Sequence, residues 1–151
     1  MLTISELLKK DFTGKAVLII GNPLSGKTRL SRLIASEKVI HTDMYLKYHR
    51  DSVLDILLYD IGNMEGGYVI EGVLGYRLLR KGVREDCWYP DVVIEVVVSD
   101  AVIEERCKAE RDISKLGGIM KLVKGCETIL ADYKSMDNDS KPEWILVDSC
   151  S

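Results

Sequence analysis

The chain has few of the residues from which metal sites and disulfide frameworks are built. Its 151 residues include four cysteines and two histidines. The cysteines are scattered without a Cys-x-x-Cys pair, and the histidines do not complete a zinc-ligand pattern. The sequence therefore gives no support for a zinc module, and the isolated thiols indicate a reducing, cytoplasmic setting.

Long apolar runs and a large excess of one charge are also absent. No run approaches the roughly 18 apolar residues of a membrane span, and residues 1–10 carry no long apolar signal region. The formal net charge of −3 gives no overall attraction to nucleic acid or to an anionic membrane. We therefore expect no membrane partner, and any nucleic acid would have to be recognised by a local site. The oligomeric state is left open.

The sequence contains one distinctive motif, G-x-x-x-x-G-K-T, which lies between an apolar run and an amphipathic stretch. Its glycines allow a tight turn that directs backbone N–H groups and a helix N-terminus at an anion. The lysine is expected to reach the terminal phosphates of a nucleotide, and the threonine hydroxyl to bind Mg²⁺. The alternative is an ordinary glycine-rich turn. The predicted phosphate loop comprises Gly21, Asn22, Pro23, Leu24, Ser25, Gly26, Lys27 and Thr28.

Five short apolar runs rich in β-branched residues predict a parallel sheet that is covered on both faces. They span residues 16–20, 38–42, 68–71, 92–98 and 144–147. Helical patterns lie between them, at 30–34, 53–61, 101–115 and 119–133. The polar stretch 135–143 is predicted as a surface loop. This alternation predicts an α/β fold, a three-layer doubly wound sheet, in a single domain over residues 1–151.

Acidic residues follow the predicted strands at the edge where ligands bind in such sheets. Asp43 is a candidate base for an acceptor hydroxyl or a ligand of a metal-bound water, and its alternative is an N-cap of the next segment. Glu71 closes a buried run, which is costly unless a cation or water is near. It is therefore a candidate Mg²⁺ ligand, and the alternative is a solvent-exposed strand end. Asp148 has the same placement and ranks lower.

The densely charged segment from Glu104 to Lys115 precedes the pair Gly117-Gly118. Such a run is usually a solvated helix face. Here it also has the position of a lid, over about residues 104–118, with the glycine pair as a hinge. Arg111 is a candidate for stabilising the charge of a transferring phosphoryl group, and Arg106 is a candidate nucleotide contact.

Two further basic groups lie beside these candidates. Residues 45–50, with two tyrosines and three basic side chains, either line an acceptor pocket or begin an exposed helix. Arg77, Arg80, Lys81 and Arg84 either contact an acceptor or belong to the ordinary surface. Neither group is long enough to demonstrate nucleic-acid binding.

Together these features resemble the P-loop kinases of the uridine kinase, phosphoribulokinase and pantothenate kinase group, within the wider set that includes adenylate and shikimate kinases. The similar pieces are the phosphate loop, Asp43, the strand end Glu71-Gly72 and Arg111-Asp112 before Gly117. The resemblance implies a strand order of 2-3-1-4-5, ATP and Mg²⁺, a small-molecule hydroxyl as acceptor, Asp43 as base and Arg111 as lid cation. Cys107 and Leu116 stand where that group usually has arginines.

The leading hypothesis is therefore an ATP-dependent kinase for a nucleoside or a similar small metabolite. The first alternative is a kinase that acts on a polynucleotide end or a modified base, because related kinases also place an aspartate and a tyrosine after the second strand. The second is a nucleotide-dependent switch that binds ATP without transferring its phosphate. The short chain and the incomplete set of lid arginines favour this last alternative.

Overall fold

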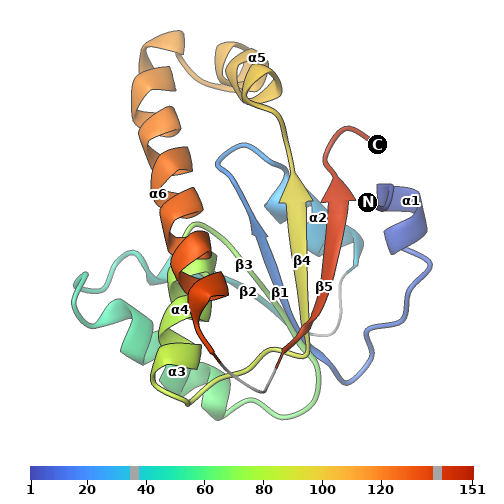
Figure 1. Ribbon diagram of the computed structural model, residues 1–151, viewed down its shortest axis with the longest axis vertical. Coiled ribbons are helices and arrows are strands. Elements are labelled where there is room, and N and C mark those ends of the chain that lie inside the picture. Colours follow the sequence, from blue (N-terminus) through green and yellow to red (C-terminus); the bar gives the residue numbers. More distant parts are fainter. Residues whose placement is uncertain (35–37, 138–140) are drawn as a thin grey trace.

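A computed structural model describes residues 1–34, 38–137 and 141–151. Its centre is a five-stranded, fully parallel sheet with the order β2-β3-β1-β4-β5, which confirms the predicted fold class and strand order (Figure 1). The strands are β1 (Ala16–Gly21), β2 (Val39–His41), β3 (Tyr68–Glu71), β4 (Val92–Val97) and β5 (Glu143–Asp148).

Helices cover both faces of the sheet, and each face has its own apolar cluster. On one face, side chains such as Leu18 and Ile70 pack with residues of α3, α4 and α6. On the other face, Ile19 and Ile94 pack with Leu7 of α1 and Leu30 of α2. Alternate residues of each strand thus enter opposite layers, as the two-residue period of a strand requires. The three layers are visible in Figure 1.

The helical elements have the following bounds. They are α1 (Ile4–Leu7), α2 (Lys27–Leu33), the 3₁₀ turn η1 (Thr42–Tyr45), α3 (Val53–Gly62), α4 (Gly75–Arg84), α5 (Asp100–Glu110), the 3₁₀ turn η2 (Ile113–Lys115) and α6 (Leu116–Ser135). In the described ranges, no helix has both the length and the apolar character that crossing a membrane requires. Of the predicted loop at 135–143, residues 138–140 lie outside the described part of the chain.

Two sequence expectations about helices are wrong. The segment 101–115 is not one helix, because α5 ends at Glu110 and Arg111 has an extended backbone. The break between the two helices is also not at Gly117 and Gly118, which lie inside α6. The chain turns instead at Asp112, whose carboxylate accepts a hydrogen bond from Ser114 N at 3.0 Å. That capping interaction starts the short turn η2, from which α6 continues.

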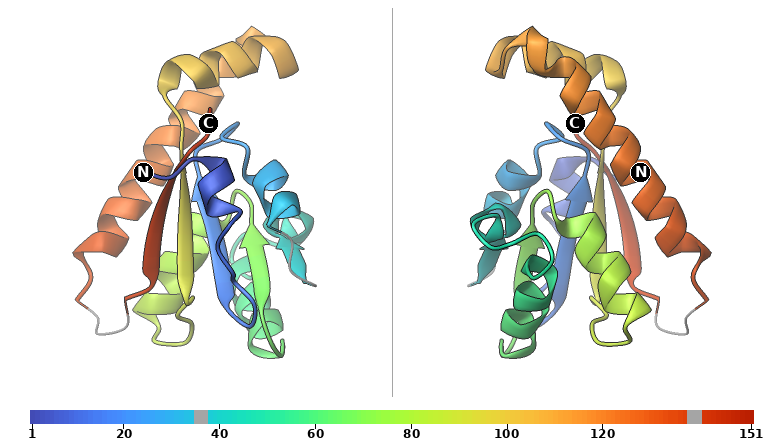
Figure 2. Two further views of the ribbon diagram at one scale, coloured as in Figure 1. Left: turned by 90° about the vertical axis from the view of Figure 1, so that its right-hand side faces the viewer. Right: turned by 90° about the vertical axis from the view of Figure 1, so that its left-hand side faces the viewer.

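Helix α5 and the first turns of α6 extend beyond the carboxyl ends of the strands, as Figure 2 shows from two sides. They are joined by a small apolar cluster in which Ile103 and Cys107 of α5 are fully buried against Ile119 and Val123 of α6. The predicted lid is therefore a packed pair of helices. The second half of α6 returns along the sheet, where Tyr133 stacks on Trp144 of β5.

Candidate functional site

The phosphate loop connects β1 to α2 at the carboxyl edge of the sheet. Gly26 has φ +94°, a conformation that favours glycine, and a Cβ at Gly21 would lie 2.5 Å from Ser25 Oγ. Gly26 is therefore favoured by its backbone conformation, and Gly21 by the close approach of Ser25. Helix α2 begins at Lys27, so its first backbone N–H groups have no partner within the helix and face an anion favourably.

The lysine of the motif folds back over its own loop. Lys27 Nζ donates hydrogen bonds to the carbonyl oxygens of Gly21 at 2.9 Å and Asn22 at 3.0 Å. Burial lowers the pKa of the Lys27 ammonium, and the charges of Glu71, Cys126 and Asp43 oppose that shift. The ammonium is thus partly desolvated and held at the mouth of the loop, where an anion would replace the two carbonyls as its partner.

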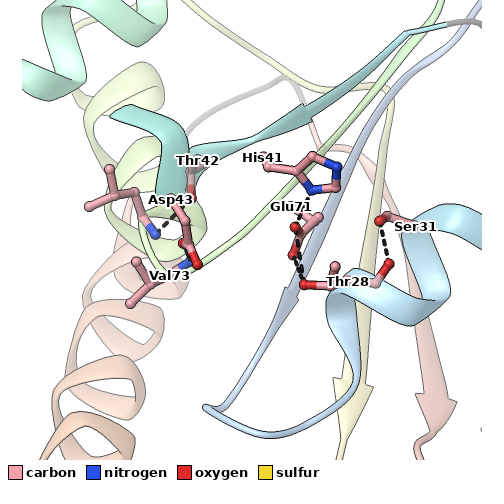
Figure 3. A network of polar contacts seen from close by, with 8 residues as sticks. Thr28, Ser31, His41, Thr42, Asp43, Glu71 and Val73 are labelled. Carbon is pink, nitrogen blue, oxygen red and sulfur yellow. Dashed lines mark hydrogen bonds and ion pairs between the residues drawn. The ribbon is translucent and has the colours of Figure 1, made fainter. Parts of the chain in front are cut away.

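A carboxylate and a hydroxyl meet beside this lysine. Thr28 Oγ1 lies 3.3 and 3.2 Å from the two carboxylate oxygens of Glu71, and His41 Nδ1 lies 2.5 Å from Glu71 Oε1 (Figure 3). Glu71 is only 3% exposed. The reading of Glu71 as a solvent-exposed strand end is therefore wrong, and its buried charge is compensated by the polar groups around it.

Thr28 and Glu71 offer the oxygen ligands that Mg²⁺ prefers. Within the described parts of the chain, no three histidine, cysteine, aspartate or glutamate side chains gather into a metal-binding group. Mg²⁺ in phosphoryl-transfer sites is usually held by one or two carboxylates together with the substrate phosphates and water. The hydroxyl and the single buried carboxylate fit that mode of binding and do not fit a site made of protein ligands alone.

Asp43 lies in η1 at the edge of the site, on the side opposite the phosphate loop. Its Oδ1 accepts a hydrogen bond from Val73 N at 3.2 Å, and Thr42 Oγ1 accepts one from Leu74 N at 3.2 Å. The two side chains thus fix the turn between β3 and α4 (Figure 3). The alternative role of Asp43 as an N-cap is not observed, because Asp43 lies inside η1, whose N-cap is His41. Its side chain remains exposed to the cavity.

One cavity of about 650 Å³ brings the predicted residues together. Its walls come from the phosphate loop, the ends of β3 and β4, and the two lid helices. Predicted site residues that line it are Gly21, Pro23, Leu24, Ser25, Gly26, Lys27, Thr28, Asp43, Glu71, Arg106 and Arg111. Asn22 is not in the lining; its carbonyl oxygen instead accepts from Lys27.

The two lid arginines differ in their surroundings. Arg106 Nη1 donates to the carbonyl oxygen of Leu24 at 2.7 Å and lies 2.9 Å from Ser149 Oγ. Arg111 follows the end of α5, is exposed, and lines the cavity. Among the described residues its side chain has no hydrogen bond or ion pair. Arg106 is therefore committed to protein contacts, whereas Arg111 is available to a ligand.

The other basic groups are largely engaged away from the cavity. Arg80 Nη1 and Arg84 Nη2 lie 3.3 and 2.7 Å from Asp132 Oδ2 on α6, and Lys81 pairs with Asp55 and Glu85. These contacts join α4 to its neighbouring helices. They support the ordinary-surface reading for these three residues.

The hydroxyl of Tyr45 is engaged by α3 and is not available to an acceptor. Its hydroxyl donates to Asp60 Oδ2 of α3 at 2.6 Å. Burial, the hydrogen bond to Asp60 and the Asp60 charge raise the pKa of Tyr45 to about 12. The phenol is therefore un-ionised near neutral pH and serves to hold η1 on α3.

Sequence reasoning missed His41 and Cys126, and it placed Ser149 only at the edge of the sheet, after the last predicted strand. The parallel register of β2 and β3 places His41 directly beside Glu71, a pairing that follows once the strand order is known. Ser149 reaches the phosphate loop from the segment after β5. Cys126 lines the cavity from α6, and burial raises the pKa of its thiol. The sequence marks Cys126 only as part of the apolar face of residues 119–133.

Comparisons with known proteins define the class of fold. No protein-family model matches the chain, and no curated protein matches it by sequence. Among solved structures, a shikimate kinase from Bacteroides thetaiotaomicron matches with a TM-score of 0.55 and 13% identity over 89% of this chain and 86% of that one. The YorR protein from Bacillus subtilis, solved with phosphorylated GDP, matches with a TM-score of 0.54 and 10% identity over 90% and 86%.

A second shikimate kinase, from Acinetobacter baumannii and solved with shikimate, has a TM-score of 0.50 and 10% identity over 89% of each chain. The chain therefore has the P-loop kinase fold. At these identities the likeness concerns the fold alone.

Proposed function

We propose that this protein is a kinase that transfers the γ-phosphoryl group of ATP to a hydroxyl of a small metabolite, a nucleoside or a similar compound. The observation that carries the proposal is a cavity whose lining brings Lys27 and Thr28 of the phosphate loop together with Glu71, Asp43 and Arg111. Phosphoryl transfer needs phosphates held in place, cations around the transferred group and a residue that orients the acceptor. Each of these requirements has a candidate residue here.

The loop would hold the donor. The N–H groups at the start of α2 and the ammonium of Lys27 bind the phosphate oxygens, and Lys27 leaves the carbonyls of Gly21 and Asn22 to do so. Thr28 and Glu71 would hold Mg²⁺, and the ion would supply positive charge to neutralise the phosphates. His41 keeps the Glu71 carboxylate oriented toward Thr28.

Asp43 would act on the acceptor. As the hydroxyl oxygen forms its bond to the γ-phosphorus, the bond from that phosphorus to the β,γ-bridging oxygen breaks and ADP leaves. The hydroxyl proton passes to the Asp43 carboxylate. One Asp43 oxygen already accepts from Val73 N, so the carboxylate is fixed on the wall of the cavity and its second oxygen is free to orient the acceptor.

The solved structures with similar folds support this class of substrates. One contains shikimate, a small hydroxylated molecule, and another contains a phosphorylated guanine nucleotide. The narrower resemblance to uridine kinases, the choice of ATP over GTP and the identity of the acceptor stay predictions. Transfer to a polynucleotide end and nucleotide binding without transfer are the alternatives that the experiment must separate.

The decisive experiment follows label from γ-labelled ATP in the presence of Mg²⁺ and a panel of nucleosides, nucleoside monophosphates, small alcohols and oligonucleotides. Transfer to a small hydroxyl compound supports the proposal. Transfer to oligonucleotides alone, with salt-sensitive binding, supports the polynucleotide alternative. Tight ATP binding without transfer to any acceptor supports the switch.

Asp43→Asn tests the assigned base with little change in structure, because the asparagine oxygen still accepts from Val73 N. We expect the transfer rate to fall about 10²- to 10⁴-fold while ATP affinity changes little. Asp51→Asn is the matched control, since Asp51 is exposed and its carboxylate pairs, among the described residues, with His49. Full activity in Asp43→Asn would remove Asp43 from the mechanism.

A further inference from the structure

The apolar face of α6 continues past the edge of the sheet and becomes part of the cavity. In the second half of the helix, Ile129 and Tyr133 pack against the core on the sheet. Leu122 and Cys126 lie on the same face, because residues at alternating spacings of three and four share one side of a helix, and both line the cavity. Ile119 lines it one turn earlier. Figure 1 shows the first half of α6 standing above the strand ends.

Val73 extends this apolar surface to the candidate base. It lines the cavity, and its N–H donates to Asp43 Oδ1 at 3.2 Å (Figure 3). Helix α4 begins two residues later and packs on α6, and Cys126 contacts the cluster that includes the start of α4. We call the following four residues the apolar wall: Val73, Ile119, Leu122 and Cys126.

The cations of the cavity come from other elements. Lys27 and Arg29 belong to α2, and Arg106 and Arg111 to α5 and its C-cap. Among the described lining residues, η1, the turn after β3 and α6 contribute no cation. The charged group that adjoins the apolar wall is the carboxylate of Asp43. The acceptor side of the cavity is therefore apolar and, where it is charged, negative.

These surroundings discriminate between acceptors by charge. Leu122 is 51% exposed and Val73 39%, so a neutral apolar body that covers them removes apolar surface from water. A carboxylate or phosphate in the same place loses hydration without gaining a cationic partner. It is also repelled by the Asp43 carboxylate. A neutral acceptor is favoured on both counts.

We infer that the acceptor is an uncharged hydroxyl compound with an apolar or aromatic body, which packs on Leu122 and Val73 while its hydroxyl reaches Asp43. The inference rests on the proposed function, because it names the acceptor class of the same site. It excludes nucleoside monophosphates, hydroxy acids and oligonucleotides as acceptors. It retains free nucleosides, whose bases are planar and uncharged. Leu122 and Val73 become residues that determine specificity.

The first test compares acceptors that differ in charge and keep a free hydroxyl. One pair is benzyl alcohol and 4-(hydroxymethyl)benzoate, and the others are nucleosides with their 3′- and 5′-monophosphates. We expect kcat/KM for the neutral member to be higher by about tenfold or more. Glycerol, which is neutral but has no apolar body, should be a poor acceptor. Equal or faster transfer to the charged members, or glycerol matching the best neutral compound, would overturn the inference.

Leu122→Ser and Leu122→Arg test the apolar wall directly. The serine variant should raise KM for the neutral acceptor about tenfold and leave KM for ATP close to the wild type, because the lost contact is with the acceptor. The arginine variant supplies a cation and should shift the preference toward the charged compounds by about tenfold. Leu8→Ser is the control, since Leu8 is an exposed leucine at the end of α1 outside the cavity lining. An unchanged acceptor KM in Leu122→Ser, or an unchanged preference in Leu122→Arg, would contradict the inference.

Arg77 provides the opposite test. It lies one helical turn beyond Val73 on α4, is half-buried, and is not in the cavity lining. An acceptor with an anionic group would find its cation there. Arg77→Ala should therefore leave the acceptor KM of the wild type unchanged. A rise in KM confined to charged acceptors would show that the protein recognises an anion, against the inference.

Alkylation of Cys126 gives a readout that does not depend on turnover. Cys126 is half-buried in the apolar wall, whereas Cys87 is exposed and outside the cavity lining. With Mg²⁺ and a non-hydrolysable ATP analogue bound, the neutral acceptor should slow iodoacetamide labelling of Cys126 beyond the analogue alone, and labelling of Cys87 should not change. Mass spectrometry of the two peptides measures both rates. Protection of Cys126 by the charged compounds alone, or by no acceptor at concentrations that saturate transfer, would refute the proposed contact.

Failure of the inference and failure of the proposed function give different results. Transfer to charged acceptors in preference to neutral ones overturns the inference and leaves the kinase in place. A wild type that transfers label to no compound removes the proposed function, and the inference with it. Unfolding curves with a single cooperative transition verify that each variant is folded.

Discussion

The phosphate loop and the lid face each other across one cavity, but they are held in different ways. The carbonyl oxygens of the loop accept hydrogen bonds from Lys27 and also from Arg106 and Ser149. The two helices of the predicted lid pack on each other through the apolar cluster between α5 and α6, and Arg111 follows the end of α5 at an exposed position. Under the proposed function, the donor site would thus be formed before ligand binds, whereas Arg111 would find its partner only when ligand is present.

Lys27→Met should produce the largest loss of phosphoryl transfer, because it removes the cation of the phosphate loop. We expect transfer to slow by about 10³-fold, the upper range for losing one group that stabilises charge in a transition state, and nucleotide affinity to fall as well. Steady-state kinetics and calorimetric titration with ATP measure both quantities. Lys121→Met, at an exposed position on α6, is the control. Transfer within tenfold of the wild type would show that the loop works without its lysine.

Arg111→Ala should separate the two halves of the site. Because Arg111 contributes no contact to the ligand-free loop, we expect ADP affinity to stay close to that of the wild type while transfer slows about 10²-fold or more. Arg32→Ala on the exposed side of α2 is the control. An equal fall in ADP affinity and in transfer rate would mean that the lid is already part of the binding site, and the contrast between the halves would disappear.

The pH dependence of ADP binding should be a smaller effect, and it concerns the phosphate loop alone. Burial lowers the pKa of Lys27 in the free protein, so its charge is lost at a lower pH than for an ordinary lysine. Bound phosphate favours the charged form. ADP affinity should therefore be constant below the free-protein pKa and fall above it, by at most about tenfold per pH unit.

Above about pH 8 the phosphates of ADP are fully ionised, since their last pKa is near 6, and they add no slope of their own. Titration calorimetry from pH 7.5 to above pH 10 measures the profile. Lys27→Met, although weaker, should show a flat profile. A slope that persists in this variant would assign the titration to another group.

Much of the fold follows from local patterns, because each strand is a short apolar run in a parallel sheet. All five runs became strands with nearly the predicted bounds. Helix α4 was missed even though Leu78, Leu79 and Val83 are buried at helical spacing. Gly75 and Gly82 lower its helix propensity. Its basic residues were interpreted as possible acceptor contacts or ordinary surface, not as part of a helix. The close packing of Gly82 on Trp88 explains the second glycine, and only the folded chain shows it.

The site also has a part that the sequence predicts and a part that only the folded chain shows. The residues of the phosphate loop, Asp43 and Glu71 stand at strand ends, so the topology alone brings them together. The contacts of Arg106 with Leu24 and Ser149 depend on the direction of its side chain. Arg106 precedes Ser149 by 43 positions and follows Leu24 by 82. No spacing rule connects residues that lie on different elements at such separations. The roles of these residues in catalysis stay predictions until the variants are measured.

Gly118→Ala is the substitution with the smallest expected effect, and it tests whether the lid moves at its glycines. A Cβ at Gly118 would meet nothing within 4 Å, and the residue lies inside α6 without a positive φ. Alanine should therefore stabilise the protein by up to about 1 kcal/mol, through higher helix propensity and a less flexible unfolded chain. Chemical denaturation measures the change.

Transfer should be unaffected in Gly118→Ala, because the turn of the lid is at Arg111 and Asp112, outside α6. Gly117→Ala, also in open space on the same helix, is the matched variant and should behave alike. A strong fall in transfer rate with unchanged stability would mean that α6 must bend at the glycine pair during the reaction. In that case the lid, unlike the loop, would change its own secondary structure on closing over the ligand.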